Sequence, residues 1–384
     1  TLIFYRQKSA TNIIKSTQSY YAAESGIEDS LIRLKNSPQM APISYSLTVG
    51  SAVTNVVIPA IIASSRVLTS DGSLLGINRK IQVVYSIDAQ GISFFYGAQV
   101  GEGGLIMNNG SRVAGNVFSN GNISGGAGTI DNNATVAGTG HSIKDITVKG
   151  NALVHSCLSP AIIEGNLTYI TGGTNTCSVQ GLTSTQSEQI PSQALPITQS
   201  QIDQWKTEAE SGGVINGNFT VGNNESASLG PAKISGNLVL GNNSIITMAG
   251  NVYVTGNIIL GNSSTINLHS SYGSLGGVII IDGTVDTGNS SILTGTGQAG
   301  SYLLVLSTNT SDFAILVSNN ASGAVFYASA GGIQLNNNIS AREITGYKVI
   351  MNNNAVINYE SGLANLFFSS GPSGGWKITS WEEK

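Results

Sequence analysis

Charged side chains are scarce in this chain, and they make up only 10% of its 384 residues. The formal net charge is −4. Phosphate binding needs clustered Lys and Arg, so this composition argues against nucleic acid as a partner. Histidine is also rare. Because His141, His155 and His269 are isolated in the sequence, they do not form a zinc motif. No stretch reaches the ~18 apolar residues of a membrane span.

Glycine and uncharged polar residues are abundant in place of charged residues. The 48 Gly show no Gly-X-Y period, which excludes collagen. Apolar residues make up 40% of the chain. A disordered chain would need high net charge and few β-branched residues, so a folded β core with a neutral surface is expected.

Asn-rich turns recur after short apolar strand fragments. They lie at Asn108-Asn109, Asn132-Asn133, Asn223-Asn224, Asn242-Asn243, Asn262, Asn289, Asn319-Asn320, Asn336-Asn337-Asn338 and Asn352-Asn353-Asn354. Gly and Asn tolerate the positive φ of a sharp corner, and stacked Asn side chains can form amide ladders. These turns therefore mark the corners of a repeating coil.

The spacing of the strand fragments predicts a solenoid over 96–372. Val221 precedes Leu240 by 19 residues, Leu240 precedes Leu260 by 20, and Leu335 precedes Met351 by 16. A repeat near 20 residues is typical of stacked units that bury their apolar faces only against each other. Because parallel crossovers are right-handed, a right-handed parallel β-helix of about ten to twelve turns is expected.

The two cysteines, Cys157 and Cys177, are separated by one repeat length. Adjacent turns lie about 4.8 Å apart, within the Cα separation that a disulfide accepts. We expect a disulfide here and an oxidising compartment.

The N-terminal part predicts a long helix over 1–37 and a small antiparallel sheet over 38–95. Apolar residues recur every seven positions as Ile13, Tyr20, Ile27 and Leu34, which forms an apolar seam between polar residues. The seam packs either on its own domain or also on other subunits. The abrupt opening at Thr1 with apolar residues suggests a hydrophobic segment upstream, so any membrane anchor is expected before Thr1.

Two further segments interrupt or end the expected coil. An insertion over 180–214 carries a short helix. Thr198 and Gln201 form a capping box at its start, and Gly212 is expected to end it. Ile202 and Trp205 share one face of this helix and are expected to dock on the flank of the coil. Aromatic and charged residues over 373–384 are expected to cap its last turn.

Two resemblances to known families follow from these segments. The stretch from Gln18 to Asp29 resembles the A-x-x-A-E-x-G-x-E stretch of minor pilins and pilus-assembly proteins, with Tyr20 in place of the first Ala. The Gly-Asn-Val/Ile coil resembles bactofilin-type polymer-forming domains and adhesin-like β-helices. The combination is similar to secreted surface proteins of candidate-phylum bacteria. These resemblances imply a cell-surface, pilus-related role and carry no catalytic residue or cofactor.

Carboxylates are the catalytic candidates in this sequence, because β-helices also carry polysaccharide-cleaving enzymes. Asp282 and Asp286 lie four residues apart and could face one side of a turn, whereas the other carboxylates are scattered. A solvated turn is the favoured interpretation of this pair.

The sequence therefore predicts a non-enzymatic, extracellular surface protein without cofactors: a pilin-like helix and sheet carrying a β-solenoid. Its expected partners are pilin-like subunits or copies of itself, through the helix, and surface glycans. A self-polymerising bactofilin-like scaffold and a carbohydrate-active enzyme remain as alternatives.

Overall fold

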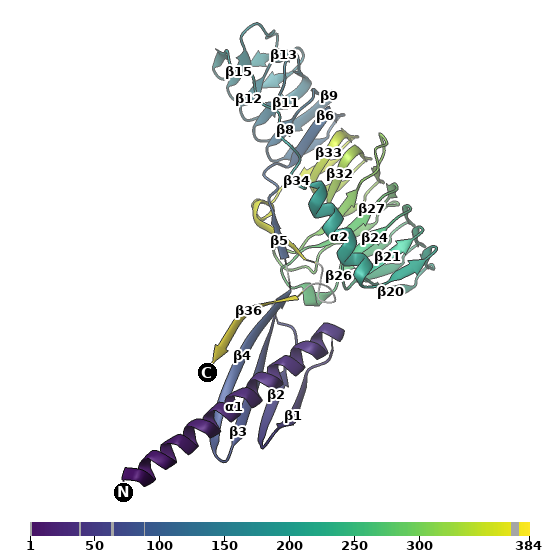
Figure 1. The fold of residues 1–384 in the computed structure, drawn as a ribbon. Coiled ribbons are helices and arrows are strands. Elements are labelled where there is room, and N and C mark those ends of the chain that lie inside the picture. The colour runs from purple at the N-terminus through teal and green to yellow at the C-terminus, as the bar shows by residue number, and fades with distance from the viewer. Residues whose placement is uncertain (1, 38–39, 63–64, 88, 370–375) are drawn as a thin grey trace. The chain divides into compact units, whose positions relative to one another are not determined.

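The structure, a computed structural model, describes residues 2–37, 40–62, 65–87, 89–369 and 376–384. It is mainly β and divides into two compact units (Figure 1). Unit 1 is Thr1–Asp88 with Gly371–Lys384, and unit 2 is Ala89–Ser370. Unit 2 is thus inserted into the chain of unit 1.

Unit 1 is a long helix packed on a small antiparallel sheet. Helix α1 (Leu2–Asn36) contacts the strands of a five-stranded sheet of order β1-β2-β3-β4-β36. Its strands are β1 (Ile43–Val49), β2 (Ala52–Ile58), β3 (Ser65–Leu74), β4 (Ile77–Ile87) and β36 (Trp376–Glu383). This confirms the predicted long helix and small antiparallel sheet.

The helix approaches the sheet closely because both surfaces carry small residues there. A Cβ placed on Gly72 of β3 would lie 2.1 Å from the carbonyl oxygen of Ser19, and one placed on Gly26 of α1 would lie 2.3 Å from Oγ of Ser70. Gly26 is the glycine of the pilin-like stretch, so its lack of a side chain has a packing reason. Larger side chains, among them Ile27 and Leu34, fill the core beside this contact.

The C-terminal segment does not cap the coil, which corrects the expectation for 373–384. Residues 376–383 form β36, which pairs antiparallel with β4, and Trp381 lies opposite Val83. Residues 373–375 lie outside the described residues. The pairing joins residues nearly 300 positions apart, so no local pattern could have indicated it. Its aromatic residues suit a strand as well as a cap.

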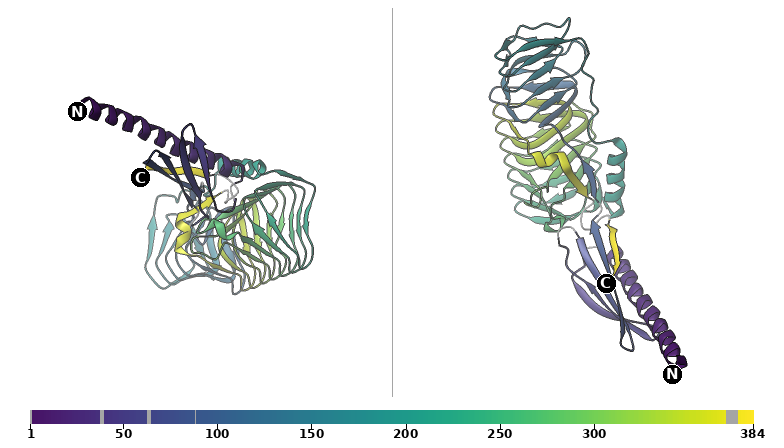
Figure 2. Two further views of the ribbon diagram at one scale, coloured as in Figure 1. Left: turned by 90° about the horizontal axis from the view of Figure 1, so that it is seen from below. Right: turned by 90° about the vertical axis from the view of Figure 1, so that its left-hand side faces the viewer.

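Unit 2 consists of short strands in parallel pairing, stacked turn upon turn (Figure 2). The register partners Val221 and Leu240, Leu240 and Leu260, and Leu335 and Met351 are the pairs from which the repeat was measured. Their side chains belong to the main core of unit 2. The predicted repeat is therefore the spacing between neighbouring turns.

Three parallel ladders run along the stack, and long strands bend from one ladder into the next. The strands of the first half are β6 (Ala98–Met107), β7 (Arg112–Ala114), β8 (Val117–Ser119), β9 (Ile123–Ile130), β10 (Ala134–Val136), β11 (Ser142–Val148), β12 (Ala152–Val154), β13 (Ser156–Leu158), β14 (Ile162–Ile163), β15 (Leu167–Ile170), β16 (Ser178–Val179) and β17 (Thr183–Gln186). Those of the second half are β18 (Val214–Asn216), β19 (Phe219–Val221), β20 (Ser226–Leu229), β21 (Ala232–Ser235), β22 (Leu238–Leu240), β23 (Ile245–Met248), β24 (Val252–Val254), β25 (Ile258–Leu260), β26 (Thr265–Leu268), β27 (Gly277–Ile281), β28 (Val285–Asp286), β29 (Ile292–Thr294), β30 (Leu303–Ser307), β31 (Ile315–Val317), β32 (Ser322–Leu335), β33 (Ser340–Met351) and β34 (Val356–Asn358).

The order of turns in the stack differs from their order in the chain. β33 and β34, at the end of the second half, pair in parallel with β6 and β7, at the start of the first half. The segment between the halves, which includes helix α2 (Gln199–Ser211), leads from the end of the first half to β18, which lies at the far end of the second (Figure 1). The predicted insertion is therefore a connection that carries the chain to the opposite end of the stack, so that the second half precedes the first in the stacking order, rather than a loop within a continuous coil.

A second core lies outside the coil, where α2 and two short segments cover one of its faces. Strands β5 (Ala89–Ile92) and β35 (Leu366–Ser369) pair antiparallel beside the turn η2 (Ser361–Asn365), and η1 (Ser270–Tyr272) precedes β27. Apolar side chains of α2, β5, η2 and β35 pack against outward-facing residues of β27, β30 and β32, whereas Tyr272 of η1 belongs to the main core.

Candidate assembly and display surfaces

The predicted apolar seam of α1 is divided between the fold of unit 1 and its surface. Ile27 and Leu34 are buried against the sheet, with 0% and 1% exposure, and Tyr20 packs partly against the same core. Ile13 is 63% exposed. The structure thus brings only part of the seam into the core of unit 1, and Ile27 and Leu34 are not available to another subunit.

Residues 3–18 of α1, here called the free segment, contain no buried side chain. Large apolar residues are exposed along it, namely Ile3, Phe4, Tyr5, Ile13 and Ile14. Its charges are all positive, from Arg6, Lys8 and Lys15. A shallow hollow of about 720 Å³ lies between this segment and the start of β4 at Ile77 and Arg79. Apart from its last turn, where Arg79 donates a hydrogen bond to Ser16 Oγ, the free segment is therefore an apolar, basic helical surface that unit 1 itself leaves exposed.

The described residues include no helix with the length and apolar character needed to cross a membrane.

A disulfide joins Cys157 and Cys177, with a Cα–Cα distance of 5.6 Å. Cys157 lies in β13, and its backbone pairs with Asn175 in the following turn. The bond links neighbouring turns at the end of the first half, where β17 has a stacking partner on one side only. It therefore ties down one end of the coil.

Helix α2 is docked on the flank of the coil by the two residues expected to do so. Ile202 and Trp205 are each 1% exposed. The Trp205 ring lies 6.3 Å, between centroids, from that of Phe368 in an edge-to-face arrangement. The capping box of Thr198 and Gln201 is present at the start of the helix. The helix therefore covers apolar surface of the coil.

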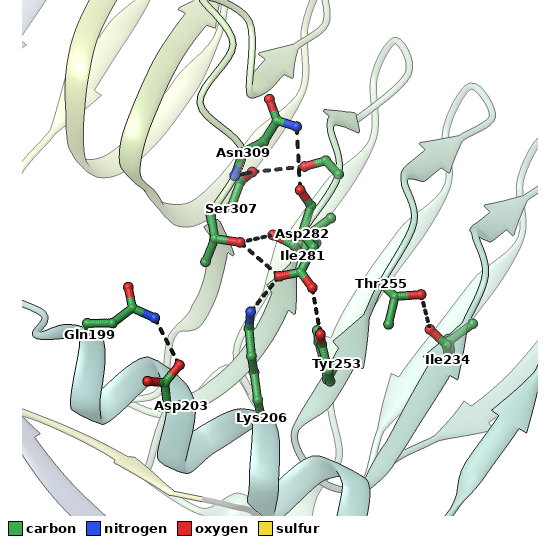
Figure 3. A network of polar contacts seen from close by, with 12 residues as sticks. Gln199, Asp203, Lys206, Ile234, Tyr253, Thr255, Ile281, Asp282, Ser307 and Asn309 are labelled. Carbon is green, nitrogen blue, oxygen red and sulfur yellow. Dashed lines mark hydrogen bonds and ion pairs between the residues drawn. The ribbon is translucent and has the colours of Figure 1, made fainter.

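The carboxylate of Asp282 fixes α2 to the coil (Figure 3). It accepts hydrogen bonds from Lys206 Nζ of α2 at 2.5 Å, from the Tyr253 hydroxyl at 2.5 Å and from Thr308 Oγ1 at 2.8 Å. Burial raises the pKa of Asp282, but these hydrogen bonds outweigh burial and hold the pKa below the usual value of a carboxyl. A glycosidase general acid needs a raised pKa. Asp282 is thus suited to a structural ion pair.

Asp286 and the histidines also make local contacts. Asp286 Oδ1 accepts hydrogen bonds from the Gly288 backbone and from Ser318 Oγ, each at 3.0 Å. The Nδ1 atoms of His141, His155 and His269 each lie within hydrogen-bonding distance of an atom no more than four residues away. The described residues contain no cluster of His, Cys, Asp or Glu suited to a metal ion.

The Asn-rich turns stack into one corner of the coil, apart from the turn at Asn132-Asn133. Backbone hydrogen bonds connect them in the stacking order, from Asn224 to Asn242, from Asn243 to Asn262 and onward to Asn354 and Asn109. Side-chain amides add a ladder from Asn108 to Asn352 and from Asn352 to Asn336. Asn133 stacks in a second such column, between Asn116 and Asn151. The asparagines hold neighbouring turns together, so their amides are largely committed within the fold.

A straight row of outward side chains, here called the outer column, runs along the third ladder. Its members are register partners in adjacent turns and none is buried: Ser226, Ile245, Thr265, Ile292, Ser322, Ser340, Val356, Arg112, Thr129, Thr147, Ile162 and Ser178. Arg112 is the one charged member, and it pairs with Asp131. The outer column continues across the junction of the halves, from Val356 to Arg112. It is a neutral surface with a repeat of about 4.8 Å.

Sequence reasoning missed two features of unit 2 that involve carboxylates. Glu343 is fully buried, accepts a hydrogen bond from Thr345 Oγ1 at 2.6 Å, and has its other oxygen without a partner among the described residues. Glu360 is bound by both Arg342 and the Tyr302 hydroxyl. Tyr302 lies 58 residues from Glu360, so only the stacking order could have indicated this cluster.

Neither a scan of protein-family models nor a search of curated proteins gave a match. Among solved structures, the chain is similar to the competence-associated pilin ComZ from Thermus thermophilus, with 10% identity, coverage of 96% of this chain and 97% of that chain, and a TM-score of 0.22. It is also similar to an ice-binding protein of the Antarctic ascomycete Antarctomyces psychrotrophicus, with 10% identity, coverage of 71% and 100%, and a TM-score of 0.21. An ice-binding protein of an Antarctic Flavobacteriaceae bacterium matches with 9% identity, coverage of 69% and 81%, and a TM-score of 0.14. TM-scores of this size do not establish a shared fold.

Proposed function

We propose that this protein is a non-enzymatic, pilus-associated surface subunit, in which unit 1 joins a filament and unit 2 is displayed. The observation that carries the proposal is the division of α1 into a buried part and the free segment. A helix that served only its own domain would have no need of an apolar surface extending beyond the sheet.

The occupant of the free segment is the corresponding helix of other pilin-like subunits, or of further copies of this chain. Burying a large apolar side chain contributes roughly 1.5–3 kcal/mol, so the exposed residues from Ile3 to Ile14 supply a large driving force for helix packing. The positive charges of the free segment would pair with acidic residues of a neighbouring helix.

Unit 2 is the displayed part, a right-handed β-solenoid on the outside of the cell. The rule that parallel crossovers are right-handed supports the handedness. The disulfide between Cys157 and Cys177 supports an oxidising compartment. The outer column provides a long uncharged surface that suits neutral surface glycans, which are rich in hydroxyl groups.

Recovery of the protein in surface filaments tests the assembly role. The full chain would be produced in its native cell as wild type, as Ile13→Asp and, for a matched control, as Phe313→Asp. Both side chains are more than half exposed, at 63% and 51%, so neither change should disturb folding. We expect Ile13→Asp to be lost from the sheared filament fraction, because it places a charge in the helix contact, and Phe313→Asp to be retained.

Equal recovery of the wild type and Ile13→Asp would contradict the role of the free segment. Filaments that form equally well from the purified chain with Ile13→Asp would instead favour the scaffold alternative, in which the ends of the coil polymerise.

A further inference from the structure

Unit 2 contains a cleft of about 340 Å³ beside the outer column. Its polar lining includes Thr294, Gln298, Ser301, Tyr302, Arg342 and Glu360, and Gly323 forms part of its wall. These residues come from β29 and the loop after it, from β32 and β33, and from the start of η2. The volume is within the range of small-molecule sites, which is roughly 300–1,000 Å³.

The wall of the cleft at Gly323 is formed by backbone, because only glycine fits at this position. Gly323 has a φ of +118°, and a Cβ on it would lie 1.9 Å from the carbonyl oxygen of Leu293. No side chain can occupy that position, so the wall of the cleft there is backbone alone.

The loop that forms the rim of the cleft is held in place. Ser301 Oγ donates to the Leu275 carbonyl at 2.8 Å, and Thr296 Oγ1 donates to the Gly273 carbonyl at 2.7 Å. Thr296 also donates its backbone N–H to Ser301 Oγ at 3.0 Å. The cleft is therefore preformed, which lowers the entropic cost of binding a ligand.

Glu360 is the chemical centre of the cleft. Arg342 donates to its Oε1 and the Tyr302 hydroxyl to its Oε2. Burial and the hydrogen bond to Glu360 raise the pKa of Tyr302 to about 12, so the phenol remains a donor at neutral pH. A carboxylate has about four acceptor positions, so each oxygen can still accept a bond from a ligand. The carboxylate is thus oriented and retains acceptor capacity.

The charges of the cleft indicate a neutral ligand. Arg342 and Glu360 neutralise each other, so neither an anion nor a cation finds an uncompensated partner among the lining residues. The remaining polar groups include the Thr294 hydroxyl and the Gln298 amide, which bind hydroxyl groups well. Tyr302 adds an aromatic ring.

We propose that this cleft binds one residue of a neutral sugar, whose adjacent hydroxyl groups hydrogen-bond to Glu360 and Arg342. This inference rests on the proposed display role, and it names the site and the ligand class for it. Thr294 and Gly323 follow Ile292 and Ser322 of the outer column along their strands. A polysaccharide lying along that column can therefore place one sugar in the cleft.

Titration of the full chain with neutral methyl glycosides of glucose, galactose and mannose, followed by calorimetry and saturation-transfer NMR, tests the inference. We expect at least one of them to bind in the millimolar range. Glu360→Ala should weaken binding about tenfold or more, because hydrogen bonds to charged groups are the strong ones. Gln298→Ala changes an exposed loop residue and should weaken binding less while leaving the fold intact.

A matched control is Glu188→Gln, which removes an exposed carboxylate outside the cleft and should bind as the wild type does. Failure of all three glycosides to bind the wild type, or equal binding by Glu360→Ala with an unchanged thermal midpoint, would overturn the inference. The filament-recovery experiment is independent of the cleft. If the wild type is recovered in filaments but binds no sugar, the assembly role stands and the sugar site is rejected. If it binds sugar but is not recovered in filaments, the sugar site stands and the assembly role is rejected.

Discussion

The ammonium group of Lys206 lies 2.5 Å from Oδ1 of Asp282, and this pair connects α2 to a turn of the coil 76 residues further along the chain. Asp282 is about one-third exposed, at 34%, so solvent screens the pair only in part. The contact is therefore expected to help hold the connection between the two halves against the second half.

Replacement of Asp282 by Asn is predicted to lower stability by about 1–2 kcal/mol at neutral pH, because charge-assisted hydrogen bonds are lost. The pKa of Asp282 is lowered in the folded state. Its contribution is thus present above the ordinary carboxyl pKa of 3.8 and is lost as the pH falls through the lower, folded-state value. Thermal unfolding of wild type and Asp282→Asn should differ at pH 7 and converge in strong acid. A difference that persists unchanged there would contradict this account.

The buried Glu343 is predicted to behave in the opposite way. Burial raises its pKa well above the usual value, so the folded state favours the protonated acid. The cost of the buried group is therefore absent at low pH and appears as the pH rises above the ordinary value of 4.5.

We accordingly expect Glu343→Gln, which keeps the shape without the charge, to raise the thermal midpoint at pH 7 and to leave it unchanged near pH 4. Asp286→Asn, at an exposed carboxylate of the same unit, serves as the control. A lower midpoint for Glu343→Gln at neutral pH would show that the charged form is stabilised in the fold.

Substitution of Gly72 by Ala is predicted to destabilise unit 1 by about 1–3 kcal/mol, the usual cost of overpacking. The added Cβ would meet the Ser19 carbonyl at 2.1 Å and push α1 away from the sheet. Gly126→Ala is the matched control, since a Cβ there would meet nothing within 4 Å. Hydrogen exchange of residues in α1 measures the effect, and equal protection in the two variants would contradict it.

Removal of the disulfide by replacing Cys157 and Cys177 with Ala is predicted to cost about 3 kcal/mol, as expected for closing a loop of this length. The effect should be confined to the last turns of the first half, because the bond links turns at that end. Hydrogen exchange should show faster exchange over β15 to β17 and no change over β22 to β25. Uniform acceleration throughout unit 2 would indicate that the coil unfolds as one piece.

The repeat of the coil could be predicted from sequence because its corners have distinctive chemistry. Asn and Gly mark positions of positive φ, and Asn224, Asn243 and Asn354 do adopt it. The capping residues of α2 carry a local signal for the same reason. Such features depend on a few neighbouring residues and can be recognised in one pass along the chain.

The stacking order could not be predicted, because every turn offers its neighbour the same parallel edge. The partners Val356 and Arg112 are joined by the same backbone hydrogen bonds as any consecutive turns, although the chain passes through both halves between them. The cleft around Glu360 depends on this order in space. Likewise, the pairing of Trp381 with Val83 has no local signal.

Ile87 and Trp376 are register partners at one end of the β4–β36 pair. The chain therefore leaves the sheet of unit 1 after Ile87 and returns to it at Trp376, two positions that lie side by side. A short hairpin could span that gap, and so could any other domain whose termini lie close together. Unit 1 can therefore carry other domains: the inserted unit can be exchanged, lengthened or removed between those residues without changing the helix for which we propose a role in filament assembly.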